Sequence, residues 1–313
     1  MVKQFLLALA AAALLGACGG NPIGGDSGTP VEPTDPVDPT DPTDPTEPTD
    51  PVELLPSDVA GHVTGAGLEG WTPGAGTLSV TMTAQDAASL TGAYVRTPAR
   101  DVGEYEAYTY QSTTSNRMVV ALVRKVEGVS AMIAVDAGQF ANYHGGGNLW
   151  RADVFTRPTD GGQGAEYNYS GTYTGLLNAG FDTAGGPGGV LNPTESIGVT
   201  GRALVTADFT EMRISGGVDQ RKVVGALIEG QDSLPDIALW ATDITADGTF
   251  SDAVHRIGTS GWVAAGSYGG AFNGDGSAVA AVMVFNPTEL PELYEHGMIV
   301  LPSCTSGGGP ACP

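Results

Sequence analysis

The sequence predicts an all-β protein in which a small antiparallel sheet is followed by an antiparallel up-and-down β-barrel. Three observations predict this fold class. Glycine supplies 47 of the 313 residues, a share about double that of an ordinary globular protein. Short runs rich in β-branched and aromatic residues lie between the glycines. Turns with Asp-Gly chemistry, such as Ala246-Asp247-Gly248, separate these runs at hairpin spacing.

The N-terminus carries the features of an export signal. The apolar run from Phe5 to Leu15 follows Lys3, ends in small residues and is too short to span a bilayer as a helix. Leu15-Gly-Ala-Cys18 resembles the bacterial lipobox. This resemblance implies that residues 1–17 are a lipoprotein signal peptide and that Cys18 is acylated. The alternative is an ordinary signal peptide with a chance cysteine.

The lipobox resemblance also predicts where the protein resides. Acyl chains on Cys18 would hold it on a membrane. Gly19 and Gly20 follow, and the absence of Asp there is similar to lipoproteins exported to the outer membrane. We expect a lipid-anchored outer-membrane protein on the cell surface, with the periplasmic face as the alternative.

Residues 18–56 are predicted to be a disordered stalk. Pro-Thr-Asp and close variants repeat from Thr29 to Pro56, and nine acids with no base lie between Asp26 and Glu53. Such a segment cannot bury apolar surface, and repeated proline favours an extended form with a reach of about 90 Å. The stalk would hold the following domain away from the membrane.

The charge and the scattered reactive residues exclude several functions. A formal net charge of -22 repels phosphates, so no nucleic-acid partner is expected. The four histidines stand singly, with no metal-ligand spacing. Gly25-Asp-Ser-Gly28 matches a serine-protease motif but lies in the stalk, and Asn273-Gly-Asp-Gly-Ser277 fits a hairpin turn better than a calcium loop. We predict no catalytic residues, no metal, no cofactor and no enzyme activity.

Residues 57–165 are predicted to form the small sheet. Strand-like runs cover 77–83, 105–110, 118–123 and 129–135, and 83–90 could form one or two helical turns. Aromatic residues gather here, and Tyr and Trp dominate protein interfaces. The candidate partner-binding residues are Tyr105, Tyr108, Tyr110, Tyr143 and Trp150, the last two in a glycine-rich loop at 142–150. The alternative is that these aromatics form the core of the sheet.

Residues 166–303 are predicted to form the barrel. Strand-like runs at 169–177, 196–209, 213–218, 236–244, 248–250, 261–272 and 278–285 follow each other at hairpin spacing. Within 196–209, alternate positions from Val199 to Ala207 carry small or aliphatic residues, and the positions between carry Thr200, Arg202, Thr206 and Asp208. Small residues on one face suit a closed meander with a tight interior.

This half is similar to the β-barrel domain of transferrin-binding protein B and related surface lipoproteins. The residues that carry the resemblance are Tyr173-Thr-Gly175, the Gly248-Thr-Phe250 turn, and Gly266 to Asn273 with Ala278 to Phe285. The resemblance implies an eight-stranded barrel, closed by the hairpin of the last two segments. It also implies that the preceding sheet corresponds to the handle of a single handle–barrel unit.

Residues 304–313 form a tail with two cysteines. Cys304 and Cys312 are an even pair separated by flexible residues in an exported chain, which indicates a disulfide; a metal site is the weaker alternative.

These features together predict a binding lipoprotein of the transferrin-binding protein B type. Its expected partners are the membrane, through Cys18, and a protein or metal-carrying solute, with a TonB-dependent receptor as a candidate further partner. Since a small barrel is filled by its own side chains, the ligand should use loops or the outer face. The alternative is a structural or adhesive surface lipoprotein without a specific ligand.

Overall fold

A computed structural model describes residues 54–83, 90–112, 118–136, 144–159, 165–178, 196–224, 233–259, 261–288, 293–304 and 312. Residues Pro51–Pro313 form one compact unit. The regular elements of its described part are strands, apart from one short α-helix, α1 (Ser57–Ala60), and one 3-10 turn, η1 (Pro98–Arg100). No helix of these residues is long and apolar enough to cross a membrane. The signal peptide, Cys18 and the stalk up to residue 53 lie outside the described residues, as does the expected helical segment at 84–89.

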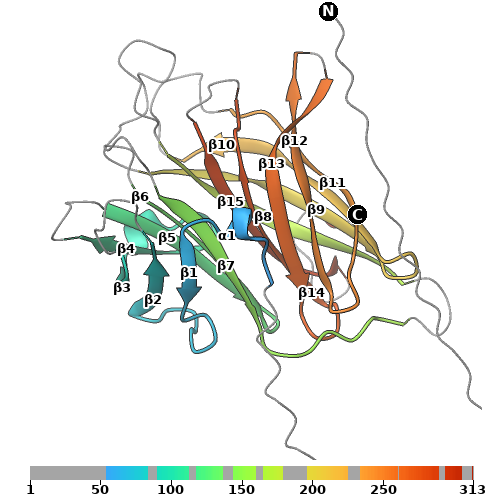
Figure 1. Ribbon diagram of the computed structural model, residues 1–313, viewed down its shortest axis with the longest axis horizontal. Coiled ribbons are helices and arrows are strands. Elements are labelled where there is room, and N and C mark those ends of the chain that lie inside the picture. The colour runs from blue at the N-terminus through green and yellow to red at the C-terminus, as the bar shows by residue number, and fades with distance from the viewer. Residues whose placement is uncertain are drawn as a thin grey trace, which may run out of the picture. The chain divides into compact units, whose positions relative to one another are not determined.

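The first part of the unit is a seven-stranded antiparallel sheet (Figure 1). Its strands follow the order of the chain: β1 (Val63–Ala66), β2 (Thr77–Met82), β3 (Gly92–Arg96), β4 (Glu106–Gln111), β5 (Met118–Val126), β6 (Val129–Asp136) and β7 (Gly145–Arg151). The two outer strands approach each other where the His62 N–H donates to the Gly145 carbonyl at 3.0 Å. The sheet therefore nearly closes on itself around a core that includes Trp71, Tyr94 and Tyr108.

Strand β7 was expected to be a loop. It pairs with β6 instead, and two of its three glycines lie where another surface comes too close for a side chain. A Cβ on Gly146 would lie 2.0 Å from the Ala60 carbonyl oxygen, and one on Gly147 would lie 2.5 Å from Val282 of the barrel. The glycines serve close approach of two surfaces. The prediction of a loop at 142–150 was therefore wrong for the described residues, although the four strands predicted in this half are all present.

The second part is a closed eight-stranded antiparallel barrel, shown in Figure 1 from green through yellow to red. It is formed by β8 (Glu166–Leu177), β9 (Ile197–Asp208), β10 (Arg213–Val223), β11 (Ile237–Asp243), β12 (Thr249–Gly258), β13 (Gly261–Phe272), β14 (Ala278–Phe285) and β15 (Glu295–Pro302). Each strand pairs with the next, and β15 pairs with β8. The predicted fold class, a sheet followed by an eight-stranded up-and-down barrel, is confirmed.

The alternation predicted for β9 is confirmed. Val199, Ala203, Val205 and Ala207 are buried in the barrel core, whereas Arg202 and Leu204 are exposed. Rings from the other strands complete this core, among them Tyr169, Phe209, Phe250, Tyr268, Phe272 and Phe285. The barrel interior is thus a packed core.

The closing strand differs from the expectation. The β13–β14 hairpin is present, with Asn273–Ser277 as its turn: Ala278 N–H donates to Asn273 Oδ1 at 2.9 Å, and Ser277 N–H donates to Asp275 Oδ1 at 3.0 Å. Closure, however, is made by β15, which no predicted run covered. Its Glu295 pairs with Leu177 of β8 and its Ile299 with Tyr173. The barrel therefore closes one strand later than the sequence motifs implied.

The sheet packs against one side of the barrel. Sheet residues Val120, Leu122, Ile133 and Leu149 share a buried cluster with outward-facing barrel residues, which are Leu176, Ala271, Ala278, Ala280, Val282, Met298 and Val300. We call these barrel residues the covered wall, and their contact with the sheet the seam. The predicted boundary at residue 165 lies between β7 and β8; the domain boundaries themselves stay predictions.

Candidate functional site

Two of the predicted partner-binding tyrosines are core residues. The Tyr105 hydroxyl crosses the seam, donating to the Thr172 carbonyl at 2.6 Å and accepting from Val300 N–H at 3.2 Å. Its pKa is raised by burial. The Tyr108 hydroxyl accepts from Trp71 Nε1 at 2.9 Å inside the sheet. Both side chains are fully buried and reach no surface, which corresponds to the core alternative that the sequence left open.

The other predicted aromatics are less enclosed. The Tyr110 ring stacks on Tyr94 with centroids 5.1 Å apart, and Lys125 Nζ lies 4.8 Å from the Trp150 ring centroid. Tyr110 and Trp150 are half-buried against the core of the sheet. Tyr143 lies outside the described residues. The structure therefore does not bring the five predicted residues together on one surface.

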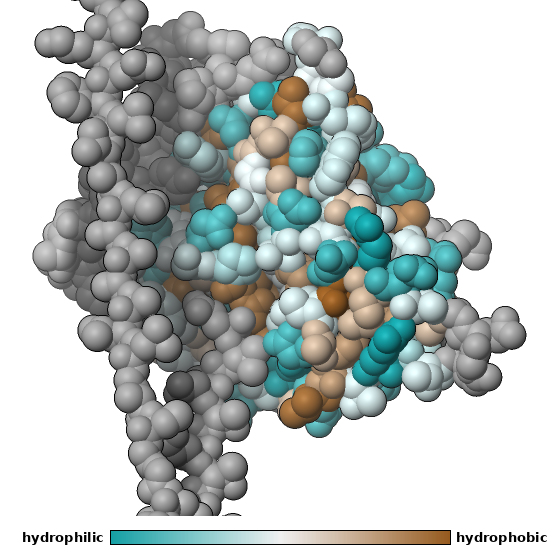
Figure 2. Space-filling view, turned by 45° about the vertical axis from the view of Figure 1, so that its right-hand side comes forward, coloured by the Kyte–Doolittle hydropathy of each residue, from teal (hydrophilic) through white to brown (hydrophobic). Residues whose placement is uncertain are grey.

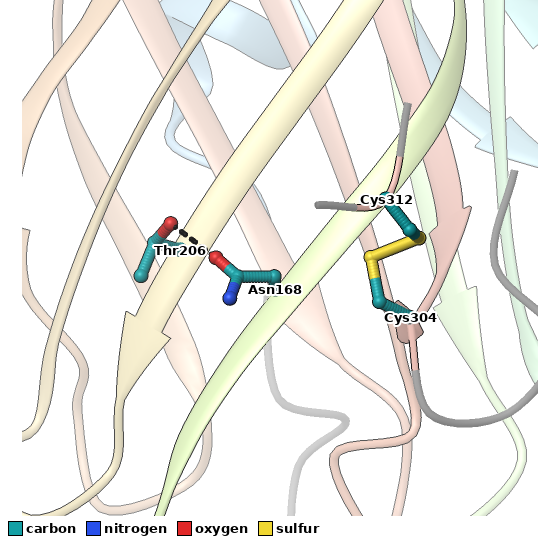
Figure 3. The surroundings of a disulfide bond; sticks show 4 residues. All are labelled: Asn168, Thr206, Cys304 and Cys312. Carbon is teal, nitrogen blue, oxygen red and sulfur yellow. Dashed lines mark hydrogen bonds between the residues drawn. A yellow bond between two sulfur atoms is a disulfide. The ribbon is translucent and has the colours of Figure 1, made fainter. Parts of the chain in front are cut away.

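The two C-terminal cysteines are joined by a disulfide. Cys304 and Cys312 have Cα atoms 5.5 Å apart, and Figure 3 shows the bond beside β8. The neighbouring strands are tied by Thr206, which donates to Asn168 Oδ1 at 2.7 Å. The bridge secures the chain directly after the closing strand.

A buried ion pair occupies the barrel core. Arg221 of β10 donates to a carboxylate oxygen of Glu295, whose other oxygen accepts from the Tyr173 hydroxyl at 2.5 Å. Arg221 and Glu295 are fully buried. Burial alone would lower the Arg221 pKa, but Glu295 and Tyr173 raise it overall. The group is enclosed by Tyr173 and Phe285, so it is a structural element that joins β8, β10 and β15.

The rest of the outer barrel surface differs from the covered wall. We call the outward-facing residues of β9, β10, β11, β12 and the first part of β13 the open wall, because the barrel residues of the seam belong to β8, the end of β13, β14 and β15. Gly198 of β9, which lies against Val102, is not included. Register aligns Leu204, Gly217, Ala238 and His255 across four successive strands. These positions form one continuous row of side chains, of which only His255 is polar.

Three large apolar side chains stand on or beside this row. Trp240, Ile257 and Trp262 are 46–48 % exposed. Ile257 and Trp262 are paired residues near the tip of the β12–β13 hairpin, and the Trp240 ring lies 4.3 Å from the His255 ring. Figure 2 shows one face of the molecule, on which brown apolar residues stand among teal polar ones. Exposed tryptophans on neighbouring strands favour protein contact.

A shallow groove of about 440 Å³ lies on the open wall, over β9, β10 and the start of β11. Its lining is mixed: apolar Leu204 and the backbone of Gly216 and Gly217 lie beside Thr206, Ser215 and the Arg202–Asp219 ion pair. Arg202 Nε donates to Asp219 Oδ1 at 2.9 Å, and this hydrogen bond lowers the Asp219 pKa. Apolar and polar groups mixed in this way are usual in protein interfaces.

Sequence reasoning missed this surface, although a signal for it was present. Ile237 and Leu239 point into the barrel, so the phase of β11 places Trp240 outside. A tryptophan out of phase with the core positions of its strand was the observation that could have found the site. Among the described residues no group of three or more His, Cys, Asp or Glu side chains could hold a metal ion.

Comparison with known proteins gives similarity of structure alone. No protein-family model matches the chain, and no curated protein matches it. Intact Ap-TbpB, with both lobes, is 10% identical with a TM-score of 0.38, covering 74% of this chain and 53% of its own. Transferrin binding protein B of Neisseria meningitidis is 12% identical with a TM-score of 0.38, covering 72% and 41%.

A third similar structure is the N-lobe of lactoferrin binding protein B of Moraxella bovis. It is 12% identical with a TM-score of 0.35, and the match covers 62% of this chain and 82% of the lobe. The chain spans about half the length of the transferrin-binding structures, 41–53%. At these scores the similarity says nothing about ligands, and the two-part architecture rests on strand order and register.

Proposed function

We propose that this protein is a lipid-anchored outer-membrane lipoprotein that binds a protein ligand through the open wall of its barrel. The observation that carries the proposal is the exposure of Trp240, Ile257 and Trp262 on neighbouring strands. An isolated barrel would gain solubility from polar residues at these positions. Their retention fits a surface that is buried when a partner binds.

The geometry favours a protein over a small solute. The interior of the barrel is filled by its own rings and by the Arg221–Glu295 pair, whereas small ligands are usually enclosed in deep pockets. The groove on the open wall is shallow, and Trp240 is exposed on the same strand, β11, as its lining residue Ile237. A broad, partly apolar surface with a charged edge suits a folded protein.

The N-terminal sequence supports the membrane attachment that this proposal includes. The Cys18 lipobox would attach the chain to a membrane, and the acidic Pro-Thr-Asp stalk would give the barrel reach. We place the protein on the cell surface, with a TonB-dependent receptor as a candidate neighbour. The absence of enzyme activity, and the roles of Tyr110, Tyr143 and Trp150, stay predictions.

Site-specific photo-crosslinking in intact cells tests the proposal. A photoreactive residue at position 262 of the full-length protein should crosslink to a discrete protein, in medium with or without added serum. The matched control is position 154, because Val154 is 84% exposed but lies away from the open wall. It should give no such product.

A second substitution separates specific binding from chance encounter. Trp240→Ser should remove the product formed at position 262, since both side chains would contact the same partner. No crosslink at position 262 in either medium would overturn the proposal. A crosslink that survives Trp240→Ser unchanged would overturn the open wall as its basis.

A further inference from the structure

Three of the four histidines, which are scattered in the sequence, meet at the seam. The His62 and His144 rings are 4.8 Å apart and meet edge to face. His144 Nδ1 lies 3.2 Å from Asp136 Oδ2. His296, on the outer side of β15, packs on Gly145 so closely that a Cβ there would lie 2.5 Å from its ring. The group joins the edges of the sheet to the closing strand of the barrel.

Most of this cluster is shielded from water. Asp136 and His144 have fully buried side chains and His296 is 3% exposed, whereas His62 is half-buried. The backbone beside the cluster is also held in place, because the Ser196 hydroxyl lies within hydrogen-bond distance of the carbonyls of both Val135 and Asp136. Added positive charge in such a site is poorly solvated and is repelled by like charge nearby.

Among the described residues, few other charged side chains lie near His296. The sheet contributes His62, His144 and Asp136. The paired residues on β14 and β8 are Val284 and Leu176. Glu295 points inward to Arg221, Asp58 of α1 is exposed, and Arg124 of β5 approaches the barrel at Gly171, toward the other end of β15. Asp136 is thus the described carboxylate that lies within the histidine cluster.

We propose that His296, packed on Gly145 of the sheet, acts as an acid-sensitive latch, which holds the sheet on the barrel when its ring is neutral and loosens the seam when the ring gains a proton. The open state would expose the covered wall, which includes Ala280, Val282, Met298 and Val300. The latch is a property of the seam and does not depend on the proposed partner of the open wall.

The direction of the pH dependence follows from His296. Burial, and then the charge of His62, lower its pKa from 6.5 to about 4. The open seam therefore binds more protons than the closed one between these values. The seam is fully closed above pH 6.5 and weakens as the pH falls toward 4. For His296 alone the open-to-closed ratio should rise about 20-fold between pH 7 and pH 5.

Hydrogen exchange of the full-length protein in non-ionic detergent tests the latch. After correction for chemical exchange, peptides from β7 and β15 should lose protection between pH 7 and pH 5, whereas peptides from β9 and β10 should not. His62→Gln and His296→Gln should reduce this difference. His255→Gln, on the open wall, is the matched control and should retain it.

Each other outcome counts against the latch. Unchanged protection of β7 and β15 would overturn it, and equal loss in all strands would show global unfolding instead. If His296→Gln fails to fold, NMR of labelled histidines in the unmodified protein replaces it. The His296 signal should titrate well below 6.5, and titration of His296 near 6.5 would also overturn the latch.

Discussion

The covered wall and the open wall of the barrel follow the same strand alternation but have different surroundings. Outward residues of the covered wall, such as Ala280 and Met298, are fully buried because the sheet lies on them. On the open wall, Trp240 and Trp262 are about half exposed. The difference teaches that the fold explains the apolar outward residues on one side, whereas on the other side they are the basis of the proposed partner site.

A matched pair of alanines gives the largest expected difference between the walls. Ala280→Asp places a charge in the seam and should reduce the free energy of unfolding by about 4 kcal/mol or more. Ala238→Asp, at an outward position of β11, should change it by less than about 1 kcal/mol. Urea unfolding measures both. Similar losses would show that the open wall is covered too.

The second largest difference between the two walls should appear on acidification, which should destabilise the covered wall through the seam. Because the pKa of His296 falls from 6.5 to about 4 in the folded state, stability should decrease as the pH falls through this window. The full effect is about 3 kcal/mol. It should appear in urea unfolding of the unmodified protein and vanish in His296→Gln. A stability that rises on acidification would contradict the sign.

Small increases in side-chain volume at the seam should also reduce the stability of the protein. Gly147→Ala adds a Cβ that would lie 2.5 Å from Val282, and it should reduce stability by about 1–3 kcal/mol. Apart from its chain neighbours, a Cβ added to Gly76 would meet no atom of the described residues within 4 Å, so Gly76→Ala should leave the stability nearly unchanged. Thermal unfolding of both variants gives the comparison. Equal midpoints would mean that the sheet is free to shift on the barrel.

The smallest effect on stability should come from the open wall. Ile257→Thr keeps a β-branched side chain at a position that is 48% exposed, so stability should change by less than about 0.5 kcal/mol. Crosslinking from position 262 should nevertheless fall. A large loss of stability would assign Ile257 to folding and weaken its proposed role in binding.

The sequence predicted strands well where one face is buried and less well where both are. Period-two alternation in β9 showed its inward face directly. In β15, Met298 and Val300 enter the seam while Ile299 and Leu301 enter the barrel core. The resulting continuous apolar run has no alternation to read. The burial of Glu295 and His296 at its start could not be predicted, because their partners, Arg221 and the seam histidines, are remote in sequence.

The site was harder to predict than the fold. Tyr105 and Tyr108 attracted notice because they cluster in sequence, yet their hydroxyls bond within the core. Trp240 and Trp262 are 22 residues apart in the sequence, and only the strand register places both on the outer face of the barrel. The same holds for His62, His144 and His296, whose proximity depends on the packing of the sheet against β15.

The position of β15 at the end of the chain has a consequence for folding. The Tyr173–Glu295 contact that accompanies closure joins residues 122 positions apart, and contacts of such long range form slowly. Until β15 arrives, β8 and β14 are unpaired edges that could associate with other chains. The same strand supplies Met298, Val300 and His296 to the seam. Barrel closure and docking of the sheet should therefore be one cooperative step, and until it is complete the edges of β8 and β14 are open to aggregation.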